Sequence, residues 1–274
     1  MTVWICSACA VEHPDTEHPP LACAICCDER QYVPKSGQAW TTLAELEAAG
    51  THIEIEELEP NLFGISVDPP VAIGQRALLV RTVDGNILWD VPGYFDEAAA
   101  ARVRDLGDVV AIVASHPHMY GSQVSWSRAL GDAPVLVADA DATWVQRTDA
   151  AISTFSGDLD ILPGVTISTV GGHFAGSSVA RWREGADGRG VLLCGDTMFP
   201  GPDGKWVTFM RSYPNYIPLS GPVALRIAAT ITSRPFDRVY GLLGGVIDSN
   251  GVEVVNRSAE RHAAWASGAF DHLT

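Results

Sequence analysis

Two histidines follow a strongly apolar segment in the middle of the chain. Residues 108–114 (DVVAIVA) have the composition of a buried strand, and the next stretch, SHPHMYGS, places His116 and His118 on either side of Pro117. A residue before proline favours extended backbone, and alternate residues of an extended chain share one face. We therefore expect both imidazoles on the same side, as a pair of metal ligands.

Two later predicted strands also end in residues that can bind a metal. His173 follows Gly171 and Gly172 after VTISTV, and Asp196 follows Gly195 after VLLC. Glycine before a ligand lets the backbone turn sharply and lets an ion approach. Three histidines and a carboxylate predict a metal site of the kind used in catalysis. The alternative is that these side chains bind nothing.

Four cysteines near the start of the chain form two Cys-x2-Cys pairs, Cys6 with Cys9 and Cys23 with Cys26. Each pair offers two thiolates from one tight turn, and two such turns complete a tetrahedral site. Residues 1–38 contain almost no core residues of their own, so the metal would supply their folding energy. The segment resembles a rubredoxin-like zinc ribbon. Zinc is the expected ion, iron would also fit four thiolates, and the alternatives are two disulfides or a redox pair.

The Pro-rich loop between the two cysteine pairs contains two further histidines. His13 and His18 lie among polar residues there, and we expect both to be solvated.

The remainder of the chain, residues 39–274, is predicted to alternate between strands and helices. Alternating apolar residues predict a strand at 52–59, and Asp84-Gly85 predicts the turn of a hairpin between two apolar strands. Helices are predicted at 41–50, 96–107, 122–131, 220–233 and 256–270. Strands with helices outside them indicate a layered α/β architecture.

The order of the metal-ligand motifs resembles the metallo-β-lactamase superfamily. His-x-His, Gly-Gly-His and a strand ending in Gly-Asp-Thr follow one another, and GNILWDVPG stands where the family has its early strand and loop. The resemblance covers roughly residues 50–250. It implies an α/β fold, the four-layered αββα sandwich of that family, as a domain of residues 39–274 after the ribbon of residues 1–38.

The chain departs from the family motif His-x-His-x-Asp-His. Tyr120 stands at the aspartate, Gly121 stands at the last histidine, and residues 239–247 (VYGLLGGVI) lack the family's late histidine. All three missing ligands serve mainly the second metal of the family. The resemblance therefore implies a site for one ion, zinc or iron, formed by His116, His118, His173 and Asp196.

The resemblance implies a metal-dependent hydrolase. A single zinc lowers the pKa of water to about 7, and Asp196 could orient that water if it is not itself a ligand. Tyr120 could donate a hydrogen bond to a developing oxyanion, or it could simply fill the pocket. The expected substrate is a small molecule with an ester, thioester or amide-type bond.

An aromatic segment after the Gly-Asp-Thr motif, residues 206–220, is expected to wall the substrate pocket. Arg211 would hold an anionic group there, beside Tyr213 and Tyr216. The same segment could equally pack internally or contact a second copy of the chain, so a homo-oligomer stays open.

Two other functions stay open. A persulfide-dioxygenase branch of the superfamily binds iron, and its ligands would correspond here to His116, His173 and Asp196. A non-catalytic scaffold, in which the ribbon binds a partner and the old site is vestigial, is the other.

Composition limits the partners and the location. The net charge of −15 and a pI of about 4.8 disfavour nucleic acid and anionic membranes as partners. No stretch approaches the ~20 apolar residues of a membrane span, and the start lacks the pattern of a secretory signal. We therefore expect a cytoplasmic protein.

Overall fold

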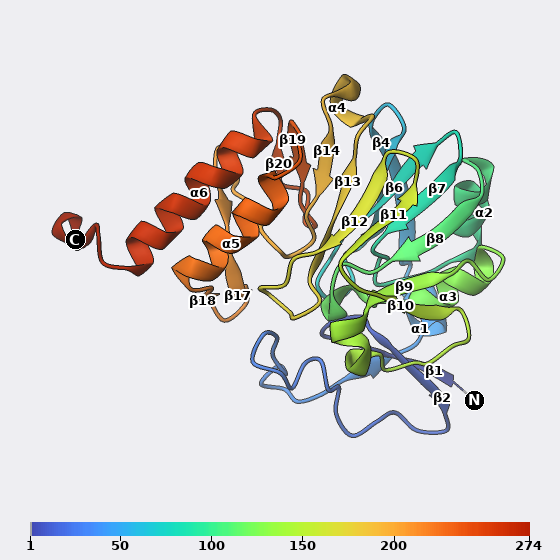
Figure 1. The fold of residues 1–274 in the computed structure, drawn as a ribbon. Coiled ribbons are helices and arrows are strands. Elements are labelled where there is room, and N and C mark those ends of the chain that lie inside the picture. The colour runs from blue at the N-terminus through green and yellow to red at the C-terminus, as the bar shows by residue number, and fades with distance from the viewer. Residues whose placement is uncertain (1) are drawn as a thin grey trace. The chain divides into compact units, whose positions relative to one another are not determined.

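The computed structural model describes residues 2–274 of the chain (Figure 1). The chain divides into two compact units, the first ending at Phe155 and the second running from Ser156 to Thr274. The cysteine-rich segment belongs to the first unit. A domain boundary at residue 38 stays a prediction. No helix within residues 2–274 combines the length and apolarity needed to cross a bilayer.

The first unit contains a seven-stranded sheet in the order β10-β9-β8-β7-β6-β5-β4. The strands β4 to β7 pair antiparallel, and β7 to β10 pair parallel. Their bounds are β4 His52–Glu59, β5 Leu62–Asp68, β6 Ala77–Thr82, β7 Gly85–Trp89, β8 Val109–Val113, β9 Val135–Ala138 and β10 Ile152–Phe155. The helices are α1 Leu43–Ala48, α2 Glu97–Asp105 and α3 Gln123–Ala129, with 3₁₀ turns η1 Pro117–Met119 and η2 Asp139–Trp144.

Local sequence explains most of this sheet. The predicted hairpin forms β6 and β7, with Thr82 opposite Gly85, whose φ of 122° a side chain would rarely allow. The apolar run of β8 lies inside the parallel half of the sheet, and its last three residues, Ala111 to Val113, are buried on both faces. Asp96 caps α2 by accepting from the backbone N–H of Ala99.

The cysteine-rich segment forms a small sheet of its own, in the order β2-β1-β3. Its strands are β1 Thr2–Cys6, β2 Glu12–Thr16 and β3 Trp40–Thr41. Ile5, Val11 and Ile25 are at most 1% exposed. The expectation that this segment has almost no core residues was wrong, because the sequence does not show that these scattered side chains converge.

A buried carboxylate ties this segment to the rest of the first unit. Glu12 on β2 accepts hydrogen bonds from the backbone N–H of Val124 and, at 2.8 Å, from the Ser125 hydroxyl, both on α3. Arg147 Nη1 lies 2.6 Å from the same carboxylate. Burial raises the pKa of the Glu12 carboxyl, and Arg147 acts in the opposite direction. A buried carboxylate without partners would destabilise the folded state, so Glu12 needs each of these donors.

The second unit contains a six-stranded sheet in the order β11-β12-β13-β14-β19-β20. The strands are β11 Asp158–Leu162, β12 Val165–Thr169, β13 Ser178–Trp182, β14 Val191–Leu193, β19 Arg238–Tyr240 and β20 Val246–Ile247. Two short pairs follow β14, namely β15 Phe199–Pro200 with β16 Val207–Thr208, and β17 Met210–Ser212 with β18 Ile217–Pro218. The helices are α4 Gly185–Gly188, α5 Gly221–Thr232 and α6 Gly251–Ala266, with the 3₁₀ turn η3 Asp271–Leu273 at the end.

The long helices α5 and α6 lie side by side in the second unit (Figure 1). Their amphipathic patterns bury Ala224, Ile227 and Val255 with the sheet residues Leu192 and Val239. This core supports the ends of β12 and β14, where two of the predicted metal ligands lie.

Replacing Arg147 with methionine tests the buried ion pair. We expect Arg147→Met to lower the free energy of unfolding by about 3–5 kcal/mol in chemical denaturation, because it leaves Glu12 buried without its cation. The control Arg128→Met removes a cation that is 55% exposed and pairs with Asp149, so it should cost less than about 1 kcal/mol. Equal effects of the two substitutions would contradict this interpretation.

Candidate metal centres

The four ribbon cysteines converge in a buried cluster. The Sγ atoms of Cys6 and Cys26 are 3.5 Å apart, and those of Cys9 and Cys23 are 3.7 Å apart. All four are free thiols at distances far longer than a disulfide bond. Two thiolates on one tetrahedral zinc lie about 3.8 Å apart, given Zn–S bonds of about 2.3 Å. The donor set and its spacing therefore fit a tetrathiolate ion and exclude two disulfides in this structure.

Two polar side chains support the cysteine cluster from outside. Gln38 Nε2 donates to Cys6 Sγ at 3.2 Å, and Gln38 Oε1 accepts from the backbone N–H of Cys23 at 3.1 Å, so one amide joins both cysteine pairs. Hydrogen bonds from Cys26, from the other two cysteines and from His13 hold the pKa of the Cys23 thiol well below its ordinary value.

The expectation that His13 is solvated was wrong. Its side chain is buried, with its ring centroid 4.6 Å from that of Trp40 in an edge-to-face contact. Trp40 lies on β3, which pairs with β1, so a residue outside the Pro-rich loop determines the burial.

The first pair of predicted ligands, His116 and His118, lies in the loop after β8. Both side chains are buried, and their ring centroids are 5.2 Å apart. His116 has extended backbone, as expected, but Pro117 begins the 3₁₀ turn η1. The expected extended path through His-Pro-His was wrong, because proline suits the first position of a helical turn and its effect falls only on the residue before it.

A hydrogen-bonded chain orients His116. The Ser115 hydroxyl donates to Asp90 Oδ2 at 3.0 Å and lies 2.9 Å from His116 Nδ1. Since the hydroxyl proton points to the carboxylate, the serine oxygen accepts from Nδ1–H. The backbone N–H of Ser115 also donates to Asp90 Oδ1, at 2.7 Å. This arrangement leaves Nε2 as the imidazole nitrogen with a lone pair, which is the form that binds a metal.

The second pair of predicted ligands, His173 and Asp196, lies in the second unit. His173 is fully buried, and its Nδ1 lies 3.2 Å from the carbonyl oxygen of Met210, to which it donates. Its Nε2 therefore carries the lone pair, and it lies 3.9 Å from Asp196 Oδ2. Two ligands of one tetrahedral zinc are about 3.4 Å apart, so this spacing needs only a small adjustment. Glycines at positive φ precede both ligands, as predicted.

Tyr120 and Gly121 are the residues that the sequence resemblance aligns with two ligands of a second metal. Tyr120 is buried, and its hydroxyl donates to the backbone carbonyl of Asp141 at 3.0 Å. Burial, with the neighbouring Asp141 charge, raises the pKa of the phenol. Gly121 has a φ of 40°, and a Cβ atom there would lie 3.0 Å from Val91 Cγ2 and 3.2 Å from the Pro92 carbonyl oxygen. The backbone at position 121 therefore leaves little room for a histidine. A catalytic role of Tyr120 stays a prediction.

Residues 239–247, where the resemblance would place a late histidine, are tightly packed at two glycines. A Cβ atom at Gly241 would lie 2.8 Å from Pro200 Cδ, and one at Gly245 would lie 2.9 Å from the Pro200 carbonyl oxygen. Neither glycine could accept a side chain without movement of β15.

The segment expected to wall a substrate pocket divides into residues near the second ligand pair and residues in solvent. Tyr213 packs against His173, with ring centroids 5.8 Å apart, and its hydroxyl donates to the Asp196 backbone carbonyl at 3.2 Å. Tyr216 is 83% exposed. Arg211 lies on β17 directly after Met210, whose carbonyl orients His173. The role of these three residues in binding substrate stays a prediction.

Sequence reasoning missed the residues that orient the ligands. Asp90 lies in the WDVPG motif of residues 89–93, which was noted only for its place in the family pattern. Ser115 directly precedes the first histidine, and a hydroxyl beside a metal ligand is a usable signal. Met210 acts through its backbone and Gln38 through a contact made by folding, so neither gave a signal.

Comparisons with known proteins show which solved structures have a similar fold. No family model matches the chain. The structure is similar to the metallo-β-lactamase DIM-1, with a TM-score of 0.56 and 13% identity over 77% of this chain and 98% of that one. It is also similar to FIM-1 from Pseudomonas aeruginosa, a metallo-β-lactamase in its mono-zinc form, with a TM-score of 0.56 and 14% identity over 77% and 96% of the chains. This likeness confirms the predicted fold class, the α/β sandwich of the metallo-β-lactamases.

A relative of much higher identity defines the family. The chain is 40% identical over 274 residues to YmaE of Bacillus subtilis (strain 168), a protein described only as uncharacterized, and the match covers 99% of this chain and 100% of that one. The chain thus belongs to the family of YmaE, whose members we expect to share the metallo-β-lactamase fold described above.

Proposed function

We propose that the chain is a metal-dependent hydrolase, in which His116, His118, His173 and Asp196 bind one divalent ion. One observation carries this proposal: in both ligand pairs a histidine has its Nδ1 proton bound by a specific acceptor, which places the lone pair that can bind a metal on Nε2. Three imidazoles and one carboxylate are a donor set that suits a divalent ion such as zinc. The metallo-β-lactamase fold adds support at the level of fold alone.

In the proposed hydrolysis, different residues of the chain have different roles. A bound ion supplies Lewis acidity toward a carbonyl or phosphoryl oxygen and lowers the pKa of water. The Ser115–Asp90 pair keeps His116 in its metal-binding form, and the Met210 carbonyl does the same for His173. The Asp196 carboxylate is 13% exposed, so it can accept a proton from water as well as contact an ion.

The proposed ion is a single one. Gly121 and Tyr120 leave no ligands for a second metal in that loop. A mono-zinc form is known for FIM-1, so the same fold can hold one zinc. Zinc is the ion we propose at this site and in the ribbon, because imidazole, carboxylate and thiolate ligands all suit it.

The proposed substrate is a small molecule with an ester, thioester or amide-type bond. Tyr213 and Arg211 belong to the segment that also orients His173. A substrate near that histidine would meet this segment, where Arg211 could pair with an anionic group.

Metal content of single and double variants tests the shared site. Purified wild-type protein should contain about two ions per chain by elemental analysis, one in the ribbon and one at the histidines. His116→Ala and His173→Ala should each contain about one, and the double variant also about one, because both residues serve the same ion. His272→Ala, which changes an exposed histidine, is the control.

Two outcomes would contradict the shared site. Unchanged metal content in both single variants would mean that the histidines bind nothing, and stepwise loss of two ions in the double variant would mean two separate sites. The same variants should lose hydrolysis of an ester or thioester panel by at least about 100-fold, since general acid–base and metal contributions are of that order. Iron in place of zinc at this site, with no hydrolysis by the wild type, would favour an oxidoreductase.

Removing the serine that orients His116 should weaken metal binding without removing a ligand. We expect Ser115→Ala to raise the dissociation constant of the histidine-bound ion by about 10- to 100-fold, because outer partners of metal ligands have effects of this size. Chelator competition measures this change. Ser153→Ala, on the exposed side of β10, is the matched control, and equal affinity in the two variants would contradict the orienting role.

Restoring the family motif should not restore a second metal. In Tyr120→Asp/Gly121→His, the new histidine would need a positive φ and would meet Val91 and Pro92. We expect the ion count to stay at about two per chain and the melting temperature to fall by several degrees. A third ion per chain, with unchanged thermal stability, would show that the loop is not closed to a second metal.

A further inference from the structure

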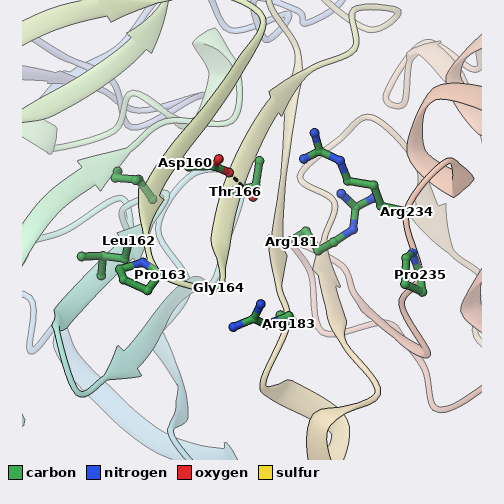
Figure 2. Close-up of a pocket in the computed structure, with 10 residues that line it drawn as sticks. Asp160, Leu162, Pro163, Gly164, Thr166, Arg181, Arg183, Arg234 and Pro235 are labelled. Atoms are coloured by element: carbon green, nitrogen blue, oxygen red, sulfur yellow. Dashed lines mark hydrogen bonds between the residues drawn. The ribbon is translucent and has the colours of Figure 1, made fainter.

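The second unit has a pocket of about 630 Å³ that none of the predicted metal ligands lines (Figure 2). Its walls come from β11, the Pro163-Gly164 turn, β12, β13 and the residues after α5. A volume of this size suits a small molecule.

The register of the strands separates this pocket from the second ligand pair. Val165 and Thr166 at the start of β12 lie opposite Trp182 and Arg181, beside the pocket. The other end of β12 leads to His173. Since a strand rises about 3.3 Å per residue, the pocket and the metal ligand lie at opposite ends of the same strand.

Three arginines line the pocket in a chain that has 18 basic and 33 acidic residues. Arg181 comes from β13, Arg183 follows that strand, and Arg234 follows α5. Figure 2 shows the guanidinium groups of Arg181 and Arg234 next to one another. Arg183 lies over the turn, 3.7 Å from where a Cβ of Gly164 would be.

The cations are only partly balanced by the protein. Arg234 pairs with Asp158 at 2.8 Å, and Asp160, which also lines the pocket, accepts from the Thr166 hydroxyl at 2.6 Å. Within residues 2–274, neither Arg181 nor Arg183 has a carboxylate within ion-pair distance. The Arg181 guanidinium donates from Nη2 to the Ile231 carbonyl at 2.6 Å, whereas its buried Nε has no hydrogen-bond partner in that part of the chain.

Two like charges side by side are unfavourable in this position. Burial, and then the charge of Arg234, lower the pKa of the Arg181 guanidinium, with Asp158 acting in the opposite direction. Arginine stays protonated nonetheless. A bound anion would relieve this repulsion and satisfy the open donors.

We propose that this pocket binds a phosphate monoester of a small apolar molecule. A phosphate monoester carries between one and two negative charges at pH 7 and three acceptor oxygens, which match the guanidinium groups of Arg181 and Arg183, neither of which has a carboxylate partner among the described residues. The apolar walls formed by Leu162, Pro163 and Pro235 would contact the organic group. The site is separate from the proposed hydrolytic site and does not depend on it.

Binding of phenyl phosphate tests the proposal directly. At constant ionic strength, calorimetry should show wild-type protein binding phenyl phosphate more tightly than inorganic phosphate, which lacks the ring, and than benzoate, which carries one charge. Arg183→Gln and Arg181→Gln should each weaken phenyl phosphate binding by about tenfold or more. Arg183 is exposed, so its variant should fold even if the Arg181 variant does not.

Two controls separate this site from general charge and from the metal. Arg189→Gln changes an exposed arginine that pairs with Asp237 outside the pocket, and it should bind like wild type. His173→Ala should also bind like wild type, so loss of binding there would place the phosphate at the metal and overturn the proposal. Absence of binding by wild type, or equal binding by the Arg183 variant, would overturn it as well.

Discussion

A hydrogen bond at one imidazole nitrogen fixes the tautomer and aims the lone pair of the other nitrogen, and the candidate centre of this chain depends on that interaction. His116 satisfies it through Ser115 and Asp90, and His173 through the Met210 carbonyl. The fold supplies these partners. Asp90 follows β7 and Ser115 lies just after β8, and because these strands are parallel neighbours their ends reach the same edge.

The cysteine-rich ribbon is hydrogen-bonded to the region that follows the first two histidines. Besides the buried carboxylate of Glu12, a backbone hydrogen bond runs from Glu12 N–H to the Gly121 carbonyl at 2.9 Å. Gly121 follows His118 by three residues, and α3, which donates to Glu12, begins directly afterwards. A metal that orders the ribbon therefore also supports the loop in which His116 and His118 lie. A freely tethered module would make no such contacts.

Much of this structure is predictable from local sequence because local sequence determines it. The alternation of residues 52–59 predicted β4 with its observed bounds, and Asp84-Gly85 predicted the β6–β7 hairpin. The convergence of the cysteines followed from spacing alone. The features that sequence analysis predicted wrongly or missed depend on contacts between distant segments. Examples are the burial of His13 against Trp40 and the hydrogen bonds of Gln38 to both cysteine pairs. The prediction of an extended His-Pro-His was wrong for a local reason. Proline is compatible both with an extended residue before it and with a helical turn that begins at it.

Under the proposal of a single ion, the residues around Tyr120 and Gly121 favour an intact site over one that has decayed. Decay would remove the orienting partners of the histidines first, since nothing would maintain a buried Ser–Asp pair beside an unused imidazole, and buried polar groups are costly to keep. Here that pair is intact. The positions of the lost ligands, in contrast, have new structural roles: Tyr120 satisfies the Asp141 carbonyl, and Gly121 allows the backbone to approach Val91 and accept a hydrogen bond from the ribbon. The Ser115–Asp90 pair beside His116 and the structural roles of Tyr120 and Gly121 are therefore the features that support the proposed single-ion site.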